Sequence, residues 1–526
     1  MERLRERLSR RSASEPVKLR KRKSHLYSKD YTTDIFENGF AIIGFSVGFR
    51  LINCFLVQSS YVPDEYWQSL EVSHRMVFGY GYLTWEWTER IRSHSYPVLI
   101  AILYKMLHIL GYDTVQLLVW SPRLIHAFLA AMADVKLYAF VRRLEHRDVA
   151  RWTYFCQLSS WFTWYCCTRT LTNTMETILT TLALCYYPVP GSKSHSSSKY
   201  LSLVALAILV RPTALIVWMP LLGFHFLQED DKLKLIMNHA LPIGAFTLGL
   251  STVLDCILYG KWTLVQLNFL RFNIWHNVAE FYGSHPWHWY FTQGCPVVLG
   301  PHLLFFIHGC TLTPKRYRIL LAAVIWTVLI YSLLPHKEFR FVYPVLPLCM
   351  LFCGFSLARL RSWRRPAAGA LVLMNLLPAL YTGLVHQRGV LDVMGHLQQL
   401  CHTASPQPDV LFLMPCHSTP FYSHIHCPIK MRFLECPPDL SGNKSYVDEA
   451  DDFFANPKHW LEVTFTQQAL LPSHLVLFDV LEKEILTFLE VNKYVRQKEV
   501  FHTHIPDGRV GEHIFIYERT LNDASD

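Results

Sequence analysis

Charged residues are scarce in this chain of 526 residues: they make up 17% of it, against about a quarter of a typical soluble domain. Hydrophobic residues make up 51%, and the mean hydropathy is +0.17. This composition excludes an ordinary soluble globular protein. Several apolar runs are long enough to cross a hydrocarbon core of roughly 30 Å, so the sequence predicts a polytopic α-helical membrane protein.

We also expect no cleavable signal peptide, because the first apolar run starts only near Gly39 and no clear small-residue cleavage site follows it. The net charge of +9 comes largely from one tail, since residues 1–30 hold 11 Lys and Arg against 4 Asp and Glu. A basic segment before an apolar run is typical of a cytoplasmic topology signal rather than a nucleic-acid site. We predict a disordered cytoplasmic tail over 1–35 and no nucleic-acid partner.

Apolar runs recur from Phe40 to about residue 385, and we estimate ten to twelve transmembrane helices in a membrane domain over 36–388. A polar, aromatic segment over 58–95 follows the first run and is too long for a turn. We therefore treat 58–95 as a separate loop with a role of its own.

Two clusters of Lys and Arg, at 315–318 and 359–365, flank a pair of apolar runs. Positive residues accumulate on the cytoplasmic side of spans. The charged segment between these two runs, 336–340, must then face the lumen. The same reasoning places the loop 58–95 and the C-terminal tail on the lumenal side.

The tail over 389–526 is predicted to be a small lumenal α/β domain. Short apolar segments predict strands at 410–414, 475–481 and 513–518, and a helical pattern covers 482–491.

Four cysteines lie in this tail, and their even number permits disulfides in the lumen: Cys401, Cys416, Cys427 and Cys436. Two of them, Cys416 and Cys427, superficially resemble a metal cluster together with His417, His424 and His426. The spacing matches no standard zinc pattern well, so disulfides or a plain structural role are the preferred interpretations. Asn443 begins a glycosylation sequon.

Two adjacent carboxylates, Asp64 and Glu65, follow Pro63 just beyond the first apolar run. An inverting glycosyl transfer needs one carboxylate as a general base close to the attacking hydroxyl. The alternative is a helix start after proline, where acids favour the helix dipole. The spacing alone leaves both interpretations open.

The segment between two apolar runs, His336-Lys337-Glu338-Phe339-Arg340, holds four ionisable side chains in five residues. Such a cluster could bind the phosphate of a lipid carrier and stabilise its charge. Ordinary flanking by positive residues is the alternative, and the topology argument disfavours it.

Further ionisable and polar residues lie inside or beside apolar runs: Arg169, Asn173, Glu176 and Arg211. Such groups are costly in a membrane and tend to face cavities or partners. Arg211-Pro212 interrupts one long run and predicts either a broken helix or a loop between two shorter spans.

An aromatic block contains His285, Trp287, His288 and Trp289. Aromatic rings stack on sugar faces and histidines bond to hydroxyls, although Trp and Tyr also mark membrane interfaces. Both interpretations stay open.

These motifs together resemble glycosyltransferase family 22, the dolichyl-phosphate-mannose-dependent α-mannosyltransferases with the C-type glycosyltransferase (GT-C) fold. The resemblance rests on His336-Lys337-Glu338-Phe339-Arg340-Phe341, Pro63-Asp64-Glu65, Arg211-Pro212-Thr213 and the block 284–290. The strings 85–90 and 414–420 are most similar to the branch that builds glycosylphosphatidylinositol (GPI) anchors. The resemblance covers nearly the whole chain after residue 35.

The resemblance implies a multi-pass protein of the endoplasmic reticulum membrane that uses dolichyl-phosphate-mannose as donor and a dimannosyl GPI precursor as acceptor. The third mannose would be added in α1,2 linkage, with inversion. It implies Asp64 as the base, with Glu65 as the alternative.

The donor phosphate would lie against His336, Lys337, Arg340 and Arg211. Substrate contacts would come from Glu338, Arg169, Asn173 and the aromatic block, without a metal or other cofactor.

Two other functions stay in play at this point. A sister mannosyltransferase of the lipid-linked N-glycan precursor shares fold and chemistry. A transporter or lipid scramblase would also show interrupted helices and buried charges. The sequence leaves the oligomeric state open.

Overall fold

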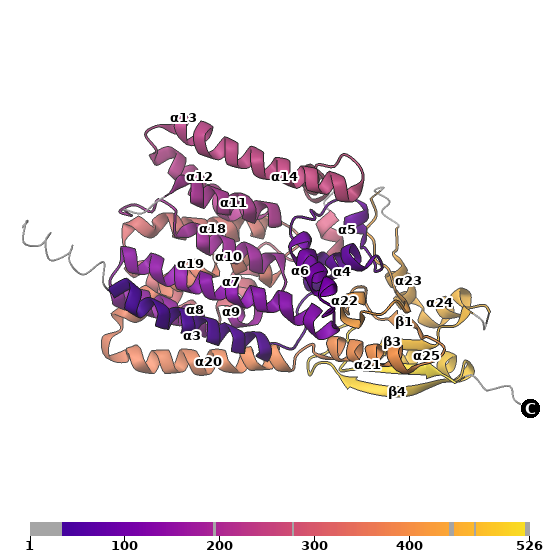
Figure 1. Cartoon of the computed structure of the whole chain (residues 1–526). Coiled ribbons are helices and arrows are strands. Elements are labelled where there is room, and N and C mark those ends of the chain that lie inside the picture. The colour runs from indigo at the N-terminus through magenta and orange to yellow at the C-terminus, as the bar shows by residue number, and fades with distance from the viewer. Residues whose placement is uncertain (1–33, 193–195, 276–277, 441–445, 468–469, 521–526) are drawn as a thin grey trace, which may run out of the picture.

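The structure is a computed structural model that describes residues 34–192, 196–275, 278–440, 446–467 and 470–520. A helical body is followed by a domain with a β-sheet at one end of it (Figure 1). The predicted basic tail falls almost wholly on 1–33, and Asn443 falls on 441–445; both lie outside the described residues.

The helices of the body are α3 (Asp34–Leu56), α4 (Glu71–Phe78), α5 (Trp85–Thr88), α6 (Pro97–Ile109), α7 (Val115–Leu144), α8 (Arg147–Ser159), α9 (Trp161–Cys166), α10 (Thr172–Leu184), α11 (Ser197–Val210), α12 (Ala214–Gln228), α13 (Lys232–Leu235), α14 (Leu241–Tyr259), α15 (Val265–Leu270), α16 (Cys295–Leu299), α17 (His302–Leu312), α18 (Arg318–Leu333), α19 (Leu346–Arg359) and α20 (Arg364–Leu384). Short π and 3-10 helices connect or extend them: η1 (Tyr66–Leu70), η2 (Ile236–Ala240), η3 (Arg271–Trp275), η4 (Val278–Tyr282), η5 (Tyr290–Gly294), η6 (Lys315–Tyr317), η7 (Phe339–Val345) and η8 (Arg361–Trp363).

Among the described residues, six helical segments are long and apolar enough to cross a membrane: Gly39–Leu56, Val115–Leu144, Lys232–Tyr259, Lys315–Leu333, Phe339–Arg359 and Arg361–Thr403. A seventh is formed if the pair Tyr290–Leu299 and His302–Leu312, bent by 100°, counts as one span. Three shorter apolar helices, α6, α11 and α12, accompany them.

This count is lower than the ten to twelve spans estimated from the sequence, because several apolar runs are broken into short helices. The run near Arg211 is one example: α11 ends at Val210 and α12 begins at Ala214. Pro212 lacks a backbone N–H, so in the interior of a helix it would remove one hydrogen bond and clash with the preceding turn. The predicted interruption at Arg211-Pro212 is confirmed.

The two ends of the helical bundle differ in what they carry. The connection from α19 to α20, with the basic cluster 359–365, lies at the end opposite the sheet domain (Figure 1). Helices α4 and α5 of the loop 58–95 lie at the end beside that domain. This arrangement agrees with the expectation that 58–95 and the tail face the same side.

The C-terminal domain consists of α21 (Gly389–Thr403), β1 (Asp409–Leu413), α22 (Tyr422–Ile425), β2 (Lys430–Phe433), α23 (Glu449–Ala455), α24 (Pro457–Thr464), β3 (His474–Phe478), α25 (Asp479–Val491), β4 (Tyr494–Phe501) and β5 (His513–Arg519). The strand order is β2-β1-β3-β5-β4. Strands β2, β1 and β3 are parallel, whereas β5 is antiparallel to β3 and β4.

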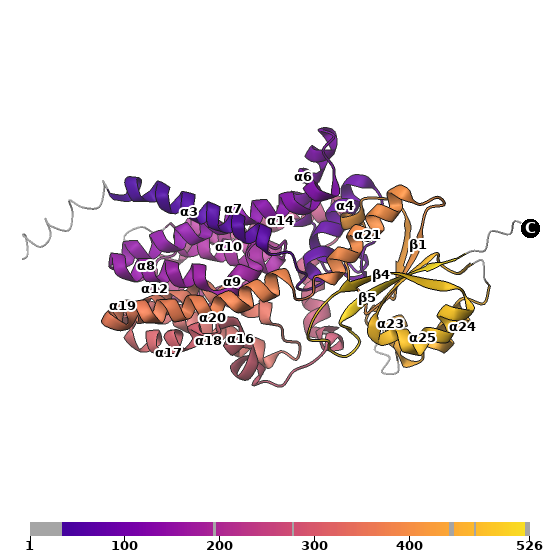
Figure 2. The ribbon, with the colours of Figure 1, turned by 90° about the horizontal axis from the view of Figure 1, so that it is seen from below.

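Both faces of this sheet are covered, as Figure 2 shows: α21 lies on one face, and α23, α24 and α25 lie on the other. The side chains of β1 are apolar on both faces, because successive side chains of a strand point to opposite faces and four consecutive residues of β1 are buried. Val410 and Phe412 belong to the core shared with α21 and the loop 58–95. Leu411 and Leu413 belong to the core under α24 and α25.

One buried carboxylate joins the loop 58–95 to the C-terminal domain. Glu71 of α4 accepts hydrogen bonds from the backbone N–H of Phe421 at 2.8 Å and of Ser423 at 3.2 Å. The hydroxyl of Ser423 donates to the same carboxylate. Burial raises the pKa of Glu71 to about 7, although these hydrogen bonds oppose the shift.

This contact predicts a pH dependence of stability. A carboxylate whose pKa is raised on folding binds its proton more tightly in the native state, so stability falls as pH rises from about 4.5 to about 7. The full effect is about 3 kcal/mol. We expect the thermal midpoint in detergent to fall over this range, and Glu71→Gln to flatten the fall. An unchanged slope in the variant would contradict this assignment.

Candidate active site

The loop 58–95 meets the segment 336–340 through one shared ion-pair network. Nη1 of Arg340 lies 2.6 Å from Oδ2 of Asp64. The same guanidinium donates from Nε to Glu338 at 2.7 Å and from Nη2 to its other oxygen at 2.5 Å. Residues 276 positions apart thus form a single cluster of two carboxylates around one arginine.

The adjacent carboxylates Asp64 and Glu65 have opposite environments. The side chain of Asp64 is 24% exposed, whereas that of Glu65 is 4% exposed. Glu65 pairs with Arg169 at 2.8 Å, and Arg169 also donates to the carbonyls of Tyr165 and Ser59. Neighbouring residues on a helical turn do not share a face, so one carboxylate is left accessible and the other is locked in the core.

Arg169 is thus placed as a support of the loop 58–95. Its side chain is 1% exposed, and its donors are taken by Glu65, Ser59 and Tyr165. The predicted substrate contact of Arg169 has no support from this placement.

Two residues before Arg340, the carboxylate of Glu338 is held as an anion. Burial alone would raise the pKa of Glu338, but Arg340 and His336 lower it to about 2. Burial lowers the pKa of His336, yet the hydrogen bond to Glu338, at 3.1 Å, raises it overall. His336 is therefore a cation over a wider pH range than a free histidine.

Lys337 points away from this network. Its ammonium donates to the carbonyls of His285 at 2.9 Å and Pro335 at 3.5 Å, and to the carbonyl of Leu334. Burial lowers its pKa. Lys337 thus ties the aromatic block to the segment 336–340, and its predicted role at a phosphate stays a prediction.

Arg211, at the helix break, is linked to Arg340 through Asn173. Nη1 of Arg211 donates to Oδ1 of Asn173 at 3.1 Å, and Nδ2 of Asn173 donates to the carbonyl of Arg340 at 3.2 Å. Nε of Arg211 lies 3.4 Å from the carboxylate of Glu176, which is fully buried. Asn173 therefore positions both predicted phosphate-binding arginines.

The aromatic block is split between buried and exposed rings. Trp289 is buried; its ring stacks on that of His285 at 5.1 Å, and the tilted ring of Phe339 lies 4.8 Å away. Trp287 is 67% exposed, and His288 is exposed as well. Lys337 binds the backbone carbonyl of His285, whereas the side chains of His285, Trp287 and His288 are all exposed.

A cavity lies beside this network, between the loop 58–95, the break at Pro212 and α15. It is lined by Gln68, Trp87, Ile91, Arg92, Ser93, Tyr96, Pro97, Thr172, Leu209, Val210, Pro212, Val265, Gln266 and Phe269. Its walls are mostly apolar, and its volume is about 30 Å³, well below the roughly 300 Å³ at which ligand sites begin, so the cavity marks a gap beside the network rather than a complete substrate pocket.

Arg92 in this cavity is a cation that sequence reasoning missed. Its Nη2 pairs with Glu86 at 2.6 Å. Burial lowers its pKa, but the charges of Glu86 and Asp64 raise it overall, so Arg92 shares the electrostatic field of Asp64. In the sequence, Arg92 is marked only by its place in a run rich in charged residues and tryptophan, 85–92.

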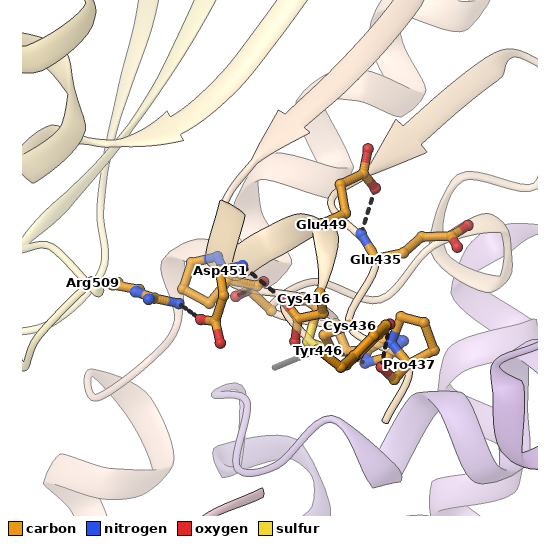
Figure 3. The surroundings of a disulfide bond; sticks show 12 residues. Cys416, Glu435, Cys436, Pro437, Tyr446, Glu449, Asp451 and Arg509 are labelled. Carbon is orange, nitrogen blue, oxygen red and sulfur yellow. Dashed lines mark hydrogen bonds and ion pairs between the residues drawn. A yellow bond between two sulfur atoms is a disulfide. The ribbon is translucent and has the colours of Figure 1, made fainter. Parts of the chain in front are cut away.

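The tail cysteines form disulfides, Cys401–Cys427 and Cys416–Cys436, as expected from their even number. Figure 3 shows the second of these bonds. Within the described ranges, the one group with the ligand types of a metal site is Cys416, His417 and Cys436. Because both of its sulfurs are bonded to each other, they are not thiolate ligands.

Comparison with known proteins identifies relatives over nearly the whole chain. Residues 41–426 match the profile of the Alg9-like mannosyltransferase family. GPI alpha-1,2-mannosyltransferase 3 of Danio rerio is 63% identical, covering 99% of this chain and 98% of its own. The Homo sapiens protein of that name is 60% identical, covering 96% and 93%.

Among solved structures, ArnT from Cupriavidus metallidurans bound to undecaprenyl phosphate is similar, with a TM-score of 0.61 and 12% identity over 93% of this chain and 99% of that one. At this identity the likeness concerns the fold alone. The architecture is the GT-C fold predicted from the sequence, with a small C-terminal sheet domain added.

Proposed function

Because the chain belongs to the Alg9-like mannosyltransferase family, we propose that the network around Asp64 and Arg340 is the centre at which it transfers mannose. Its relatives at about 60% identity are GPI α1,2-mannosyltransferases, and the chain is a glycosyltransferase of this kind. The observation that carries the placement is the 2.6 Å pair between the accessible carboxylate and the buried arginine.

The donor we propose is dolichyl-phosphate-mannose, and the acceptor is the dimannosyl GPI precursor. The site would face the lumen of the endoplasmic reticulum, with the N-terminus in the cytoplasm. Support comes from the basic clusters at the opposite end of the bundle and from the two disulfides, which persist in an oxidising compartment.

In the proposed reaction Asp64 accepts the proton of the acceptor's 2-hydroxyl. The hydroxyl oxygen attacks the anomeric carbon as the bond from that carbon to the phosphate oxygen breaks on the opposite face. The β-linked donor becomes an α-linked product in a single inverting step. Glu65 cannot act without leaving Arg169, so its role is to hold the loop that presents Asp64.

The leaving phosphate gains charge, and cations that are already in place stabilise it without reorganisation. Arg340 is the nearest candidate, with Arg92, Arg211 and His336 around it. Arg340 donates a hydrogen bond to Asp64. A donor phosphate that accepted this hydrogen bond instead would free the carboxylate of Asp64 to act as a base. Donor binding would thereby activate Asp64.

The function is tested by lipid analysis of cells that lack this protein. We expect the dimannosyl GPI precursor to accumulate and the wild-type chain to restore its conversion. Accumulation of a truncated dolichol-linked oligosaccharide, with normal GPI, would contradict the proposal and favour the N-glycan branch. Neither the relatives nor the site favour that branch or a transporter over GPI synthesis.

The reaction is expected to need no metal ion, because arginine and histidine supply the positive charge. Purified enzyme should retain its full rate of mannose transfer in excess chelator. Loss of activity that an added divalent metal restores would contradict this expectation.

A further inference from the structure

A second pocket lies between the loop 58–95 and the C-terminal domain. It is lined by Tyr82, Leu83, Trp85, Thr88, Glu89, His417, Phe433, Glu435, Cys436, Pro437, Pro438 and Leu440. Figure 3 shows Glu435 and Cys436 among the residues around the disulfide. Both parts of the chain contribute, so the pocket exists only when the two are assembled.

The walls combine aromatic faces with carboxylates. The rings of Tyr82 and Phe433 lie 4.9 Å apart, nearly perpendicular, and Trp85 stacks on Tyr282 at 6.4 Å. The hydroxyl of Tyr82 donates to Oε1 of Glu435 at 2.8 Å. Flat apolar rings suit the C–H faces of a sugar, and carboxylate oxygens suit its hydroxyls, because charge-assisted hydrogen bonds are strong.

The charge of this pocket opposes that of the donor site. Two carboxylates, Glu89 and Glu435, line it, and its side chains include no Lys or Arg. An anionic lipid phosphate would be repelled here, whereas a neutral or cationic glycan would not. The pocket thus fits the acceptor's sugars and excludes the donor's phosphate.

The pocket lies close to the proposed base. The ring of Trp67, three residues after Asp64, contacts the ring of His417 at 4.9 Å. Burial lowers the pKa of His417 to about 4, and the charge of Asp64 opposes this shift, which places the two groups within electrostatic reach. The disulfide Cys416–Cys436 fixes the wall that carries His417.

We propose that this pocket binds an inner sugar of the acceptor glycan, so that the terminal mannose reaches Asp64. This assignment rests on the function proposed above. The C-terminal domain would then select the acceptor, while the membrane body binds the donor. Trp85 and Glu435 are its specificity residues.

The test uses purified full-length enzyme, radiolabelled dolichyl-phosphate-mannose and the dimannosyl GPI acceptor. We expect Trp85→Ala and Glu435→Gln each to raise the acceptor KM about tenfold, with kcat and donor KM little changed. The matched control is Glu484→Gln, on the exposed face of α25, which should change neither constant. Glu89→Gln, at an exposed position of the pocket, provides a second variant in case Trp85→Ala does not fold.

A truncated acceptor that keeps the two mannoses but lacks the inner sugars sharpens the result. Wild type should bind it about as weakly as the variants bind the full acceptor. Unchanged acceptor KM in folded Glu435→Gln and Glu89→Gln, or a change in donor KM alone, would overturn the pocket assignment. If the wild type transfers no mannose to the GPI acceptor, the proposed function fails instead.

Discussion

Asp64→Asn should lower the rate of mannose transfer about 10³-fold, the middle of the range for a general base. The amide cannot accept the proton of the attacking hydroxyl. Folding should survive, because Arg340 keeps its two bonds to Glu338 and the side chain at position 64 is partly exposed. The measurement is turnover of radiolabelled donor by purified protein, with donor binding measured in parallel.

Glu65→Gln is the matched control for this prediction, since it removes the adjacent carboxylate. We expect it to act on stability, because it leaves the buried charge of Arg169 uncompensated at a cost of about 3 kcal/mol. The protein that remains folded should keep a measurable rate. A folded but inactive Glu65→Gln together with an active Asp64→Asn would move the base to Glu65.

Arg340→Met should lower kcat/KM by about 10² to 10³, as expected for a preorganised charge that stabilises a leaving group. The change removes the cation nearest to Asp64 and leaves Glu338 with His336 as its only charged partner among the described contacts. Arg340→Lys should recover part of the loss, because it restores charge without the two-pronged geometry.

The control for arginine loss is Arg388→Met, at the start of α21, where Arg388 forms an exposed pair with Asp392. Exposed ion pairs contribute little to stability, so the kcat/KM and the thermal midpoint of Arg388→Met should match those of the wild type. If Arg340→Met stayed within a few-fold of the wild type while folded, the phosphate would have to be bound elsewhere.

Much of this site can be predicted from the sequence because its residues are conspicuous there. Ionisable groups between apolar runs are costly, and so His336–Arg340 and Asp64 stand out without any coordinates. The positive-inside rule puts both on one side, and the ion pair between Arg340 and Asp64 agrees. Four cysteines in one polar tail permit disulfides, whereas their pairing, Cys401–Cys427 and Cys416–Cys436, comes from the structure alone.

These sequence patterns do not show which of several adjacent ionisable residues acts in the reaction and which supports the fold. Asp64 and Glu65 differ in role because Arg169, about a hundred residues away, takes one of them. Lys337 looks like a phosphate ligand in the sequence, yet backbone carbonyls occupy its donors. These outcomes depend on tertiary packing, which no local rule describes.

In the C-terminal domain, strands β1, β3 and β5 are found where apolar segments predict them. The second predicted segment, 475–481, ends earlier in the structure, because α25 begins at Asp479. Strands β2 and β4 are missed: their exposed positions carry charged side chains, as in KMRF and YVRQKEVF, and both lie at the edges of the sheet. Edge strands are often charged, so they give a weak apolar signal.

The central claim is that Asp64 and Arg340, which are paired in the structure, separate when the donor binds and then act on the two sides of the same anomeric carbon. A structure of the protein with a non-hydrolysable analogue of dolichyl-phosphate-mannose tests it most directly. The account predicts the phosphate on Arg340 and the Asp64 carboxylate facing the anomeric carbon from the opposite side. A phosphate bound away from Arg340, or Glu65 released from Arg169 to face that carbon, would contradict it.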